Sequence, residues 1–280
     1  MKPRRAAILR EMGLAPLWRL RAAREEDAPA GEENAPVGNV PTPPPVKDAR
    51  RPVPDARVAG RAAAVAAPVP EAPPSGLALQ PAVGERLQRI AVLDWPELEE
   101  SIRACRACVL CERRTQAVPG VGDREARWMF VGEGPGSEED RRGEPFVGQA
   151  GRLLDNMLAA LGLERGEDVY IANAVKCRPP HNRTPEAAEI GACLPFLDRQ
   201  IALVQPRLLV ALGRPAAQAL LGREISIAAA RGKRFERGGV AVAVTYHPAY
   251  LLRNPQDKGK AWEDLCFARA LMSAACPEKA

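Results

Sequence analysis

Four cysteines come from three segments that lie far apart in the chain: Cys105-x2-Cys108, Cys177 and Cys193. Thiolate is the ligand that both iron–sulfur clusters and zinc take. Seven cysteines in a reducing compartment are not expected to form a disulfide framework. A thioredoxin-like pair would stand between a strand and a helix, whereas Cys105 and Cys108 end a helical pattern. The spacing therefore predicts a metal or iron–sulfur centre that holds three segments together.

A glycine-rich turn, Gly132-Glu133-Gly134-Pro135-Gly136, offers a second kind of chemistry. It is not a P-loop, because no Gly-Lys-Ser/Thr follows, and its spacing fails the dinucleotide fingerprint. Glu133 would also repel a pyrophosphate. The glycines would let the backbone approach a flat ligand or a phosphate closely, although a plain strand-to-helix turn would use the same residues.

Three further side chains are candidates for binding a base. Asn173 offers a donor and an acceptor in one plane, which matches the pairing edge of a nucleobase. His247 can donate a hydrogen bond to developing negative charge near neutral pH. Phe146 can serve as a stacking platform. Each also has a structural interpretation, as a turn residue, a satisfied half-buried side chain or a core residue.

Strands and helices alternate in the C-terminal two thirds, and this alternation places these residues. Apolar runs predict strands at 128–131, 169–172, 208–212 and 240–245. Helices are expected from Asp94, at 151–161 and at 184–204, the last capped by Thr184 with Pro185 in its first turn. The expected fold is a three-layer α/β/α domain with a central four-stranded, mainly parallel sheet. The strands lead to Glu133, Asn173, Gly213-Arg214 and His247, which should converge at one edge.

The composition divides the 280 residues into three parts. Residues 28–86 hold thirteen of the 28 prolines and no aromatic residue, so we expect a disordered linker that spans on the order of 45 Å. Residues 1–27 form a short basic, apolar peptide, and residues 87–280 form the folded domain. No run of eighteen apolar residues and no secretory signal is present, so a cytoplasmic protein is expected. The basic residues cluster around the predicted loops, which fits phosphate contacts or an ordinary solvated surface.

Taken together, these motifs resemble the type 4, iron–sulfur uracil-DNA glycosylases. The resemblance covers roughly residues 90–275 and is carried in order by Cys105-x2-Cys108, the 132–136 turn with Glu138-Glu139-Asp140, the segments 144–148 and 173–180, Cys193, and 247–253. It implies a DNA repair enzyme that flips uracil out of DNA and hydrolyses its N-glycosidic bond, leaving an abasic site. It also implies a monofunctional enzyme, because a strand-cutting one would need an amine nucleophile and Lys176 is the only lysine in these motifs.

The resemblance also assigns roles to individual residues. It implies a structural [4Fe–4S] cluster on Cys105, Cys108, Cys177 and Cys193, although Cys108-x2-Cys111 is an equally good pair, and Cys266 and Cys276 would be spare thiols. Glu133 and His247 would be catalytic, with Glu133 in the motif where family 1 enzymes carry a water-activating aspartate. Uracil would be bound by Gly134, Phe146, Asn173 and His247. DNA would be contacted by Lys176, Arg178 and the segment Tyr250-Leu251-Leu252-Arg253, whose apolar side chains would form a wedge.

Other functions remain open on the residues alone. A zinc-stapled DNA-binding module without catalysis would use the same cysteines. A phosphohydrolase would hold magnesium with Glu133, Glu138, Glu139 and Asp140. Residues 1–25 also resemble the N-terminal peptide of the psi subunit of bacterial DNA polymerase III, which implies the clamp loader as a partner of an otherwise monomeric protein.

Overall fold

A computed structural model describes residues 79–275, with side chains from residue 84 onwards. The predicted peptide 1–27, residues 28–78 of the predicted linker, and Cys276 lie outside the described residues. Helix α2 (Leu79–Val92) begins within the last part of the predicted linker. The folded domain therefore starts before residue 87.

A six-stranded sheet forms the centre of the domain, with strands in the order β1-β3-β2-β4-β6-β5. The strands are β1 (Val121–Gly122), β2 (Trp128–Gly132), β3 (Val169–Asn173), β4 (Leu208–Leu212), β5 (Phe235–Arg237) and β6 (Val240–Thr245). The four central strands β3, β2, β4 and β6 are parallel and match the four predicted runs. The prediction of four strands was wrong in number, because the antiparallel strands β1 and β5 extend the sheet at its two edges.

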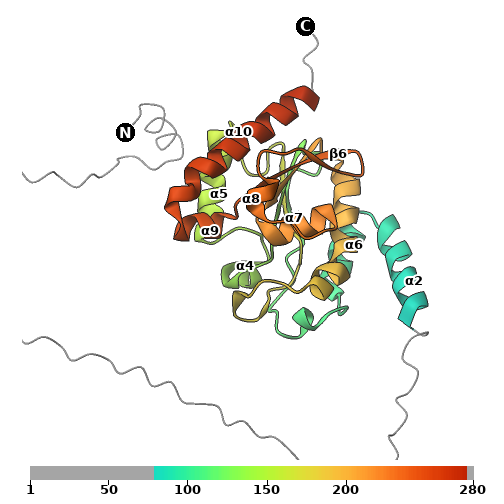
Figure 1. The fold of residues 1–280 in the computed structure, drawn as a ribbon. Helices are drawn as coiled ribbons and strands as arrows, with labels where there is room; N and C mark the ends of the chain where they lie inside the picture. The colour runs from blue at the N-terminus through green and yellow to red at the C-terminus, as the bar shows by residue number, and fades with distance from the viewer. Residues whose placement is uncertain (1–78, 276–280) are drawn as a thin grey trace, which may run out of the picture. The chain divides into compact units, whose positions relative to one another are not determined.

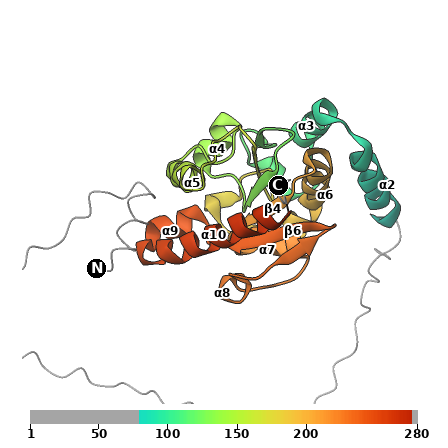
Figure 2. The same cartoon turned by 90° about the horizontal axis from the view of Figure 1, so that it is seen from above.

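Helices cover both faces of the sheet, as the apolar strands require. The remaining helical elements are α3 (Trp95–Ala104), η1 (Val109–Glu112), α4 (Ser137–Arg142), α5 (Gln149–Ala160), η2 (Pro180–Asn182), α6 (Ala187–Val204), α7 (Arg214–Leu221), α8 (Ile227–Ala230), α9 (Pro248–Arg253), η3 (Pro255–Asp257) and α10 (Lys258–Ala275). Figures 1 and 2 show α5, α9 and α10 on one side and α2 and α6 on the other. Alternate residues of β2 follow this division: Met129 and Val131 pack towards α6, and Trp128 and Phe130 towards α5 and α10.

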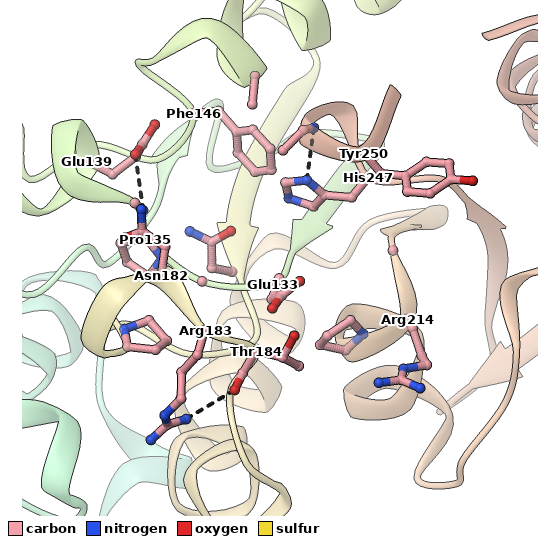
Figure 3. A pocket seen from close by; sticks show the side chains of 18 of the residues that line it. Glu133, Pro135, Glu139, Phe146, Asn182, Arg183, Thr184, Arg214, His247 and Tyr250 are labelled. Atoms are coloured by element: carbon pink, nitrogen blue, oxygen red, sulfur yellow. Dashed lines mark hydrogen bonds between the residues drawn. The ribbon is translucent and has the colours of Figure 1, made fainter. Parts of the chain in front are cut away.

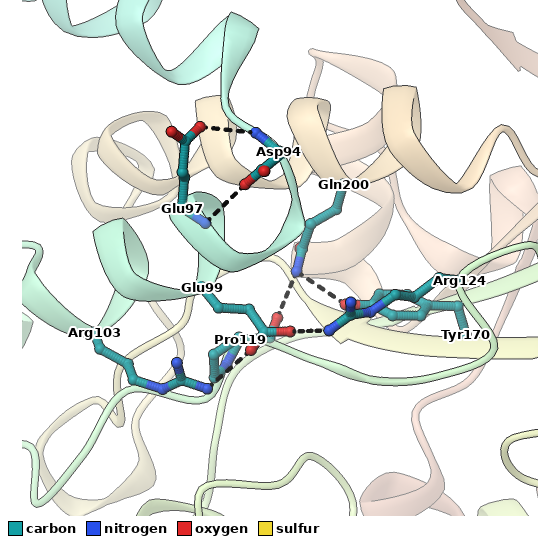
Figure 4. A network of polar contacts seen from close by, with 8 residues as sticks. All are labelled: Asp94, Glu97, Glu99, Arg103, Pro119, Arg124, Tyr170 and Gln200. Atoms are coloured by element: carbon teal, nitrogen blue, oxygen red, sulfur yellow. Dashed lines mark hydrogen bonds and ion pairs between the residues drawn. The ribbon is translucent and has the colours of Figure 1, made fainter.

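The start of α3 agrees with its prediction. Asp94 is the N-cap: its carboxylate accepts a hydrogen bond from the Glu97 N–H, and the Glu97 carboxylate accepts one from the Asp94 N–H (Figure 4). The helix ends at Cys105, so it delivers the first cysteine of the pair. Beneath it, the side-chain amide of Gln200 donates to the Pro119 carbonyl at 2.7 Å and lies 3.3 Å from the Tyr170 hydroxyl. This buried network joins α6 to the first strands of the sheet.

The start of α6 differs from its prediction. The helix begins at Ala187 with Glu186 as the N-cap, not at Thr184. Glu189, three residues after the cap, accepts a hydrogen bond from the Glu186 N–H at 2.8 Å. This bond satisfies a backbone N–H at the start of the helix, which favours a start at this position. Thr184 is thereby left in the preceding loop, where its side chain is available to the site. Among the described helices none is long and apolar enough to cross a membrane.

Candidate active site

The carboxyl ends of the four parallel strands surround one cavity of about 560 Å³. Glu133 follows β2, Asn173 ends β3, Gly213 follows β4 and His247 lies two residues after β6, and all four line this cavity. Figure 3 shows Glu133 and His247 in it. The chain passes from β2 to β3 and then returns across β2 to β4, which opens a crevice at this edge. The predicted convergence is therefore found in the structure.

Asn173 is 2% exposed, and its side-chain oxygen has no hydrogen-bond partner within the described residues. A buried polar atom without a partner costs free energy, and such atoms are rare in folded proteins. The atom lies next to Gly132, because a Cβ built on Gly132 would lie 2.4 Å from it. Asn173 also lines the cavity, so a donor that enters the cavity is a candidate partner for its amide.

His247 is the N-cap of α9, and its ring is fixed by the helix that it starts. The Ala249 N–H donates a hydrogen bond to Nδ1 at 3.1 Å, so Nδ1 carries no proton and the neutral ring holds its proton on Nε2. Burial, with a smaller effect of the nearby Arg253 cation, lowers the pKa of His247 to about 4. Near neutral pH the ring is therefore an uncharged donor that lines the cavity.

Phe146 lies against His247, with ring centroids 5.5 Å apart and planes inclined by 29°. Its backbone has φ of +56°, an uncommon conformation for a residue with a side chain. Gly132, at the end of β2, leaves room for this arrangement, because a Cβ there would lie 2.5 Å from the Phe146 ring. Asn173, Phe146 and His247 all line the cavity, and Figure 3 shows the rings of Phe146 and His247 side by side.

Glu133 is half-buried in the cavity wall, and the pKa of its carboxyl group is raised above its usual value. Burial raises the pKa of this carboxyl group, while a hydrogen bond with the Thr184 side chain and the cations of Arg214 and Arg253 lower it. Arg214, which was expected at this edge of the sheet, also lines the cavity, whereas Thr184 and Tyr246 line it but were missed from the sequence.

The carboxylates of Glu138, Glu139 and Asp140 are already engaged within the protein. Glu138 pairs with Arg141 on the surface. Glu139 accepts hydrogen bonds from the N–H groups of Gly136, Val147 and Gly148, and Asp140 accepts from Thr115 and Gln116. These residues therefore hold loops together and leave no set of free carboxylates for magnesium, which argues against the phosphohydrolase hypothesis.

The cysteines of all three predicted segments line a second, small cavity beside α3 and α6: Cys105, Cys108, Cys111, Cys177 and Cys193. Burial raises the pKa of the Cys108, Cys177 and Cys193 thiols, and the charge of the Cys105 thiolate adds to the rise in all three pKa values. Polar groups also reach two of the sulfurs. The Lys176 N–H lies 3.3 Å from Cys193 Sγ, and Arg114 Nη1 lies 2.9 Å from Cys177 Sγ.

This donor set fits an iron–sulfur cluster, whose thiolate ligands commonly accept hydrogen bonds from backbone and side-chain N–H groups. The fit is one of donor chemistry and not of a preformed metal site, because within residues 79–275 no group of three His, Cys, Asp or Glu side chains is arranged to hold a metal ion. Cys105 and Cys111 both line the small cavity together with Cys108.

The predicted phosphate contact of Lys176 is contradicted by its position. The side chain is 1% exposed, and its ammonium group donates to the Asn173 carbonyl at 2.8 Å and to Gln200 Oε1 at 2.6 Å. Burial lowers the pKa of Lys176 to about 8. Because the ammonium group lies in the buried network and not among the residues that line the large cavity, it can reach neither DNA nor a sugar bound there.

The predicted wedge segment divides between the core and the surface. Leu251 is fully buried in the core beneath α9, so its predicted DNA contact was wrong. Leu252 is 42% exposed, and Tyr250 and Arg253 line the cavity. The Tyr250 hydroxyl donates to Asp257 at 2.7 Å, and its ring stacks on Tyr246. Arg178 lies in the loop after β3, where its guanidinium donates to Asn182 at 2.7 Å.

Comparison with known proteins gives consistent matches. The family described as "Uracil DNA glycosylase superfamily" matches residues 119–266. The chain is 46% identical over 183 residues to a type-4 uracil-DNA glycosylase of Pyrobaculum aerophilum, covering 62% of this chain and 93% of that protein. It is 49% identical over 159 residues to a type-4 uracil-DNA glycosylase of Thermotoga maritima, covering 56% and 82%. A type-5 uracil-DNA glycosylase of Thermus thermophilus is 35% identical over 161 residues, covering 46% and 73%.

Proposed function

Because this chain belongs to the uracil DNA glycosylase superfamily, and within it to the type 4 enzymes, we infer that it removes uracil from DNA by hydrolysing the N-glycosidic bond. It is a monofunctional hydrolase of DNA repair. The observation that best supports the site is the unpartnered amide oxygen of Asn173, buried beside Phe146 and His247. Release of free uracil from uracil-containing DNA, with an alkali-sensitive abasic site left behind, is the direct test.

Recognition of the base is assigned to Asn173 and Phe146. Uracil presents an N–H donor at N3 and a carbonyl oxygen at C4, so one planar amide can accept from the first and donate to the second. Cytosine has the opposite pattern at these two positions, and a fixed amide would therefore reject it. The Phe146 ring would stack on the flipped base, and Gly134 of the 132–136 turn, which lines the same cavity, would lie near the 5-position of the base.

Departure of the base is assisted by His247. The bond breaks with the electron pair moving onto uracil, so negative charge develops on its carbonyl oxygen at C2 while the sugar becomes oxocarbenium-like. The neutral ring of His247 donates from Nε2 to that oxygen, and a donor already in place stabilises this charge without reorganisation. Glu133, which lines the same cavity, would orient the attacking water and accept its proton.

Contact with DNA is assigned to exposed groups around the cavity. Arg178 and Arg253 would contact phosphates, and Tyr250 would line the entrance of the flipped nucleotide. Leu252 takes the role of the wedge that fills the gap left in the duplex. Flipping costs a few kcal/mol, which a mismatch partly offsets.

Replacing Leu252 with alanine is expected to lower single-turnover uracil release from a U·A duplex by about tenfold, with a smaller loss from single-stranded DNA, because only the duplex needs its gap filled. Leu87, an equally exposed leucine on α2 away from the cavity, provides the matched control: Leu87→Ala should leave both rates unchanged. Equal losses on duplex and single strand would show that Leu252 is not a wedge.

The four cysteines Cys105, Cys108, Cys177 and Cys193 are proposed to hold a structural [4Fe–4S] cluster. The cluster would supply cross-linking of three chain segments and no redox step. Cys177 lies four residues after Asn173, and the buried Lys176 between them donates a hydrogen bond to the Asn173 carbonyl. The cross-link would therefore help to fix the position of the end of β3. Purified protein that is colourless and carries one zinc per chain would favour the zinc-stapled alternative.

Arg114→Gln is expected to increase the rate at which the visible absorbance of the cluster is lost to a chelator in air by about tenfold. The substitution removes the charged hydrogen bond to Cys177 Sγ, and groups that support ligands commonly change affinity by this factor. Arg113→Gln, at the exposed neighbouring position, should bleach at the unmodified rate. Identical bleaching of the two variants would contradict a role of Arg114 at the cluster.

A further inference from the structure

Phe146 is held by polar groups outside the cavity as well as by its ring contacts. Its φ of +56° is uncommon for a non-glycine residue, and such a conformation persists only where the surroundings fix it. Gly151 at the start of α5 allows the close approach, because a Cβ there would lie 1.7 Å from the Phe146 carbonyl oxygen. The backbone at Phe146 is thus packed directly on α5.

One guanidinium group holds both peptide planes that flank Phe146. Arg165, in the loop between α5 and β3, donates from Nη1 to the Pro145 carbonyl at 3.0 Å and from Nη2 to the Phe146 carbonyl at 2.9 Å. The angle between these two planes is what φ and ψ of Phe146 describe. A rigid, planar fork bound to both carbonyls therefore fixes that angle, which a single point charge would not do.

Two carboxylates complete the hydrogen bonds around Arg165 and Phe146. Asp155 of α5 accepts from Arg165 Nε and Nη2 at 2.9 and 2.8 Å, which orients the guanidinium. The amide at the far end of the Phe146 peptide, the Val147 N–H, donates to Glu139 at 3.0 Å. This peptide is therefore bound at its carbonyl by a cation and at its amide by a carboxylate. Arg165 itself does not line the cavity.

We propose that Arg165 is a positioning residue for uracil release: bound to the carbonyls of Pro145 and Phe146, it keeps the Phe146 ring over the base site and against His247. This inference rests on the proposed stacking role of Phe146. Arg165 touches neither the base nor the sugar and acts only through Phe146. Substitution of Arg165 is accordingly expected to lower the rate of uracil release while leaving the hydrogen bond donated by His247 in place.

Arg165→Met is expected to lower the single-turnover rate of uracil release by about 10- to 100-fold, because a displacement of about 1 Å in a positioning group has effects of this size. Inhibition by free uracil should weaken in parallel, since the stacking platform is displaced. In a Phe146→Ala background the same substitution should change the rate less than about twofold. Arg165→Lys, which cannot hold both carbonyls in one plane, should recover only part of the rate.

Arg237 provides a matched control for loss of stability. Its guanidinium also binds two backbone carbonyls, those of Ala219 and Leu220, and one carboxylate, Asp198, but it lies away from the cavity. Arg237→Met should lower Tm about as much as Arg165→Met while leaving the rate of uracil release unchanged. If Arg165→Met does not fold, Asp155→Asn replaces it, with a smaller loss of rate that again disappears in the Phe146→Ala background.

The outcomes separate this inference from the function on which it rests. Absence of uracil release by the unmodified protein would overturn the proposed function itself. Full activity of Phe146→Ala would remove the stacking role and the inference with it. An equal loss from Arg165→Met in the presence and absence of Phe146, or no loss in its presence, would overturn the positioning role alone.

Discussion

Asn173→Ala is expected to reduce kcat/KM for uracil release by about two to three orders of magnitude. The substitution removes both hydrogen bonds to the pairing edge of uracil, and each buried polar group left without a partner costs about 1–3 kcal/mol, which gives a loss of this order. The folded protein should be no less stable, because the amide oxygen has no partner within the described residues and its removal relieves a buried, unsatisfied group. Single-turnover kinetics and thermal unfolding of the same samples measure both effects.

Two further variants sharpen this test. Asn173→Asp keeps the shape of the side chain but replaces the donor facing the C4 carbonyl of uracil with an acceptor, so it should be nearly as inactive as the alanine variant. Asn156→Ala, at an exposed position of α5, should retain full activity. Uracil release at more than about one tenth of the original rate by Asn173→Ala would show that the amide does not read the base.

His247→Ala is expected to lower kcat by about 10²- to 10³-fold, the usual cost of removing one donor from an oxyanion site. KM should change much less, because the bond to the carbonyl oxygen strengthens only as the base departs. The other histidine, His181, lies in an exposed loop, and His181→Ala should be fully active. A loss confined to KM would mean that His247 binds the base without stabilising its departure.

The protonation of His247 should also be visible in the stability of the protein. Its pKa is about 4 in the folded chain and about 6.5 in an unfolded one, so between these values the unfolded chain binds more protons. The free energy of unfolding should therefore fall as the pH is lowered from 6.5 to 4, by up to about 1.4 kcal/mol per pH unit. Denaturant midpoints measured across this range should fall less steeply in His247→Ala than in His181→Ala.

The parallel core of the fold could be predicted because its strands are continuous apolar runs. Two of the four predictions, 208–212 and 240–245, agree with β4 and β6 at both ends. The edge strands could not be found in this way. β1 contains two residues, Val121 and Gly122, and β5 contains Phe235, Glu236 and Arg237, so neither shows the alternation or apolar length that marks a strand. They form because the neighbouring strands offer free backbone groups.

The residues that follow the parallel strands were predicted to meet at one edge, and they line one cavity because the sheet itself brings them together. The errors fall on residues whose exposure depends on packing. Lys176 follows a strand in a polar segment, and only the structure shows Gln200 from α6 reaching its ammonium group. Leu251 and Leu252 are chemically equivalent in the sequence, and the orientation of α9 buries one and exposes the other. Motif letters carry no information about such orientation.

Sequence reasoning missed the roles of several supporting residues, both inside and outside the motifs. Thr184 was assigned to a helix cap, and its place beside Glu133 follows from α6 starting later than expected. Glu139 could have been found, since it stands three residues after the glycine that starts α4, where a carboxylate returns to the backbone. Arg165 lies in a loop with no helical or strand pattern, and nothing in its neighbourhood in the sequence points to Phe146.

The two short outer strands have a consequence for how this protein behaves when it is concentrated. A four-stranded parallel sheet would present long rows of unsatisfied main-chain groups to any passing chain, the template on which cross-β aggregates grow. Within residues 79–275 the outermost rows are instead only two and three residues long, and one of them carries Glu236 and Arg237. Crowding many copies along damaged chromosomes should therefore not seed fibrils from this sheet.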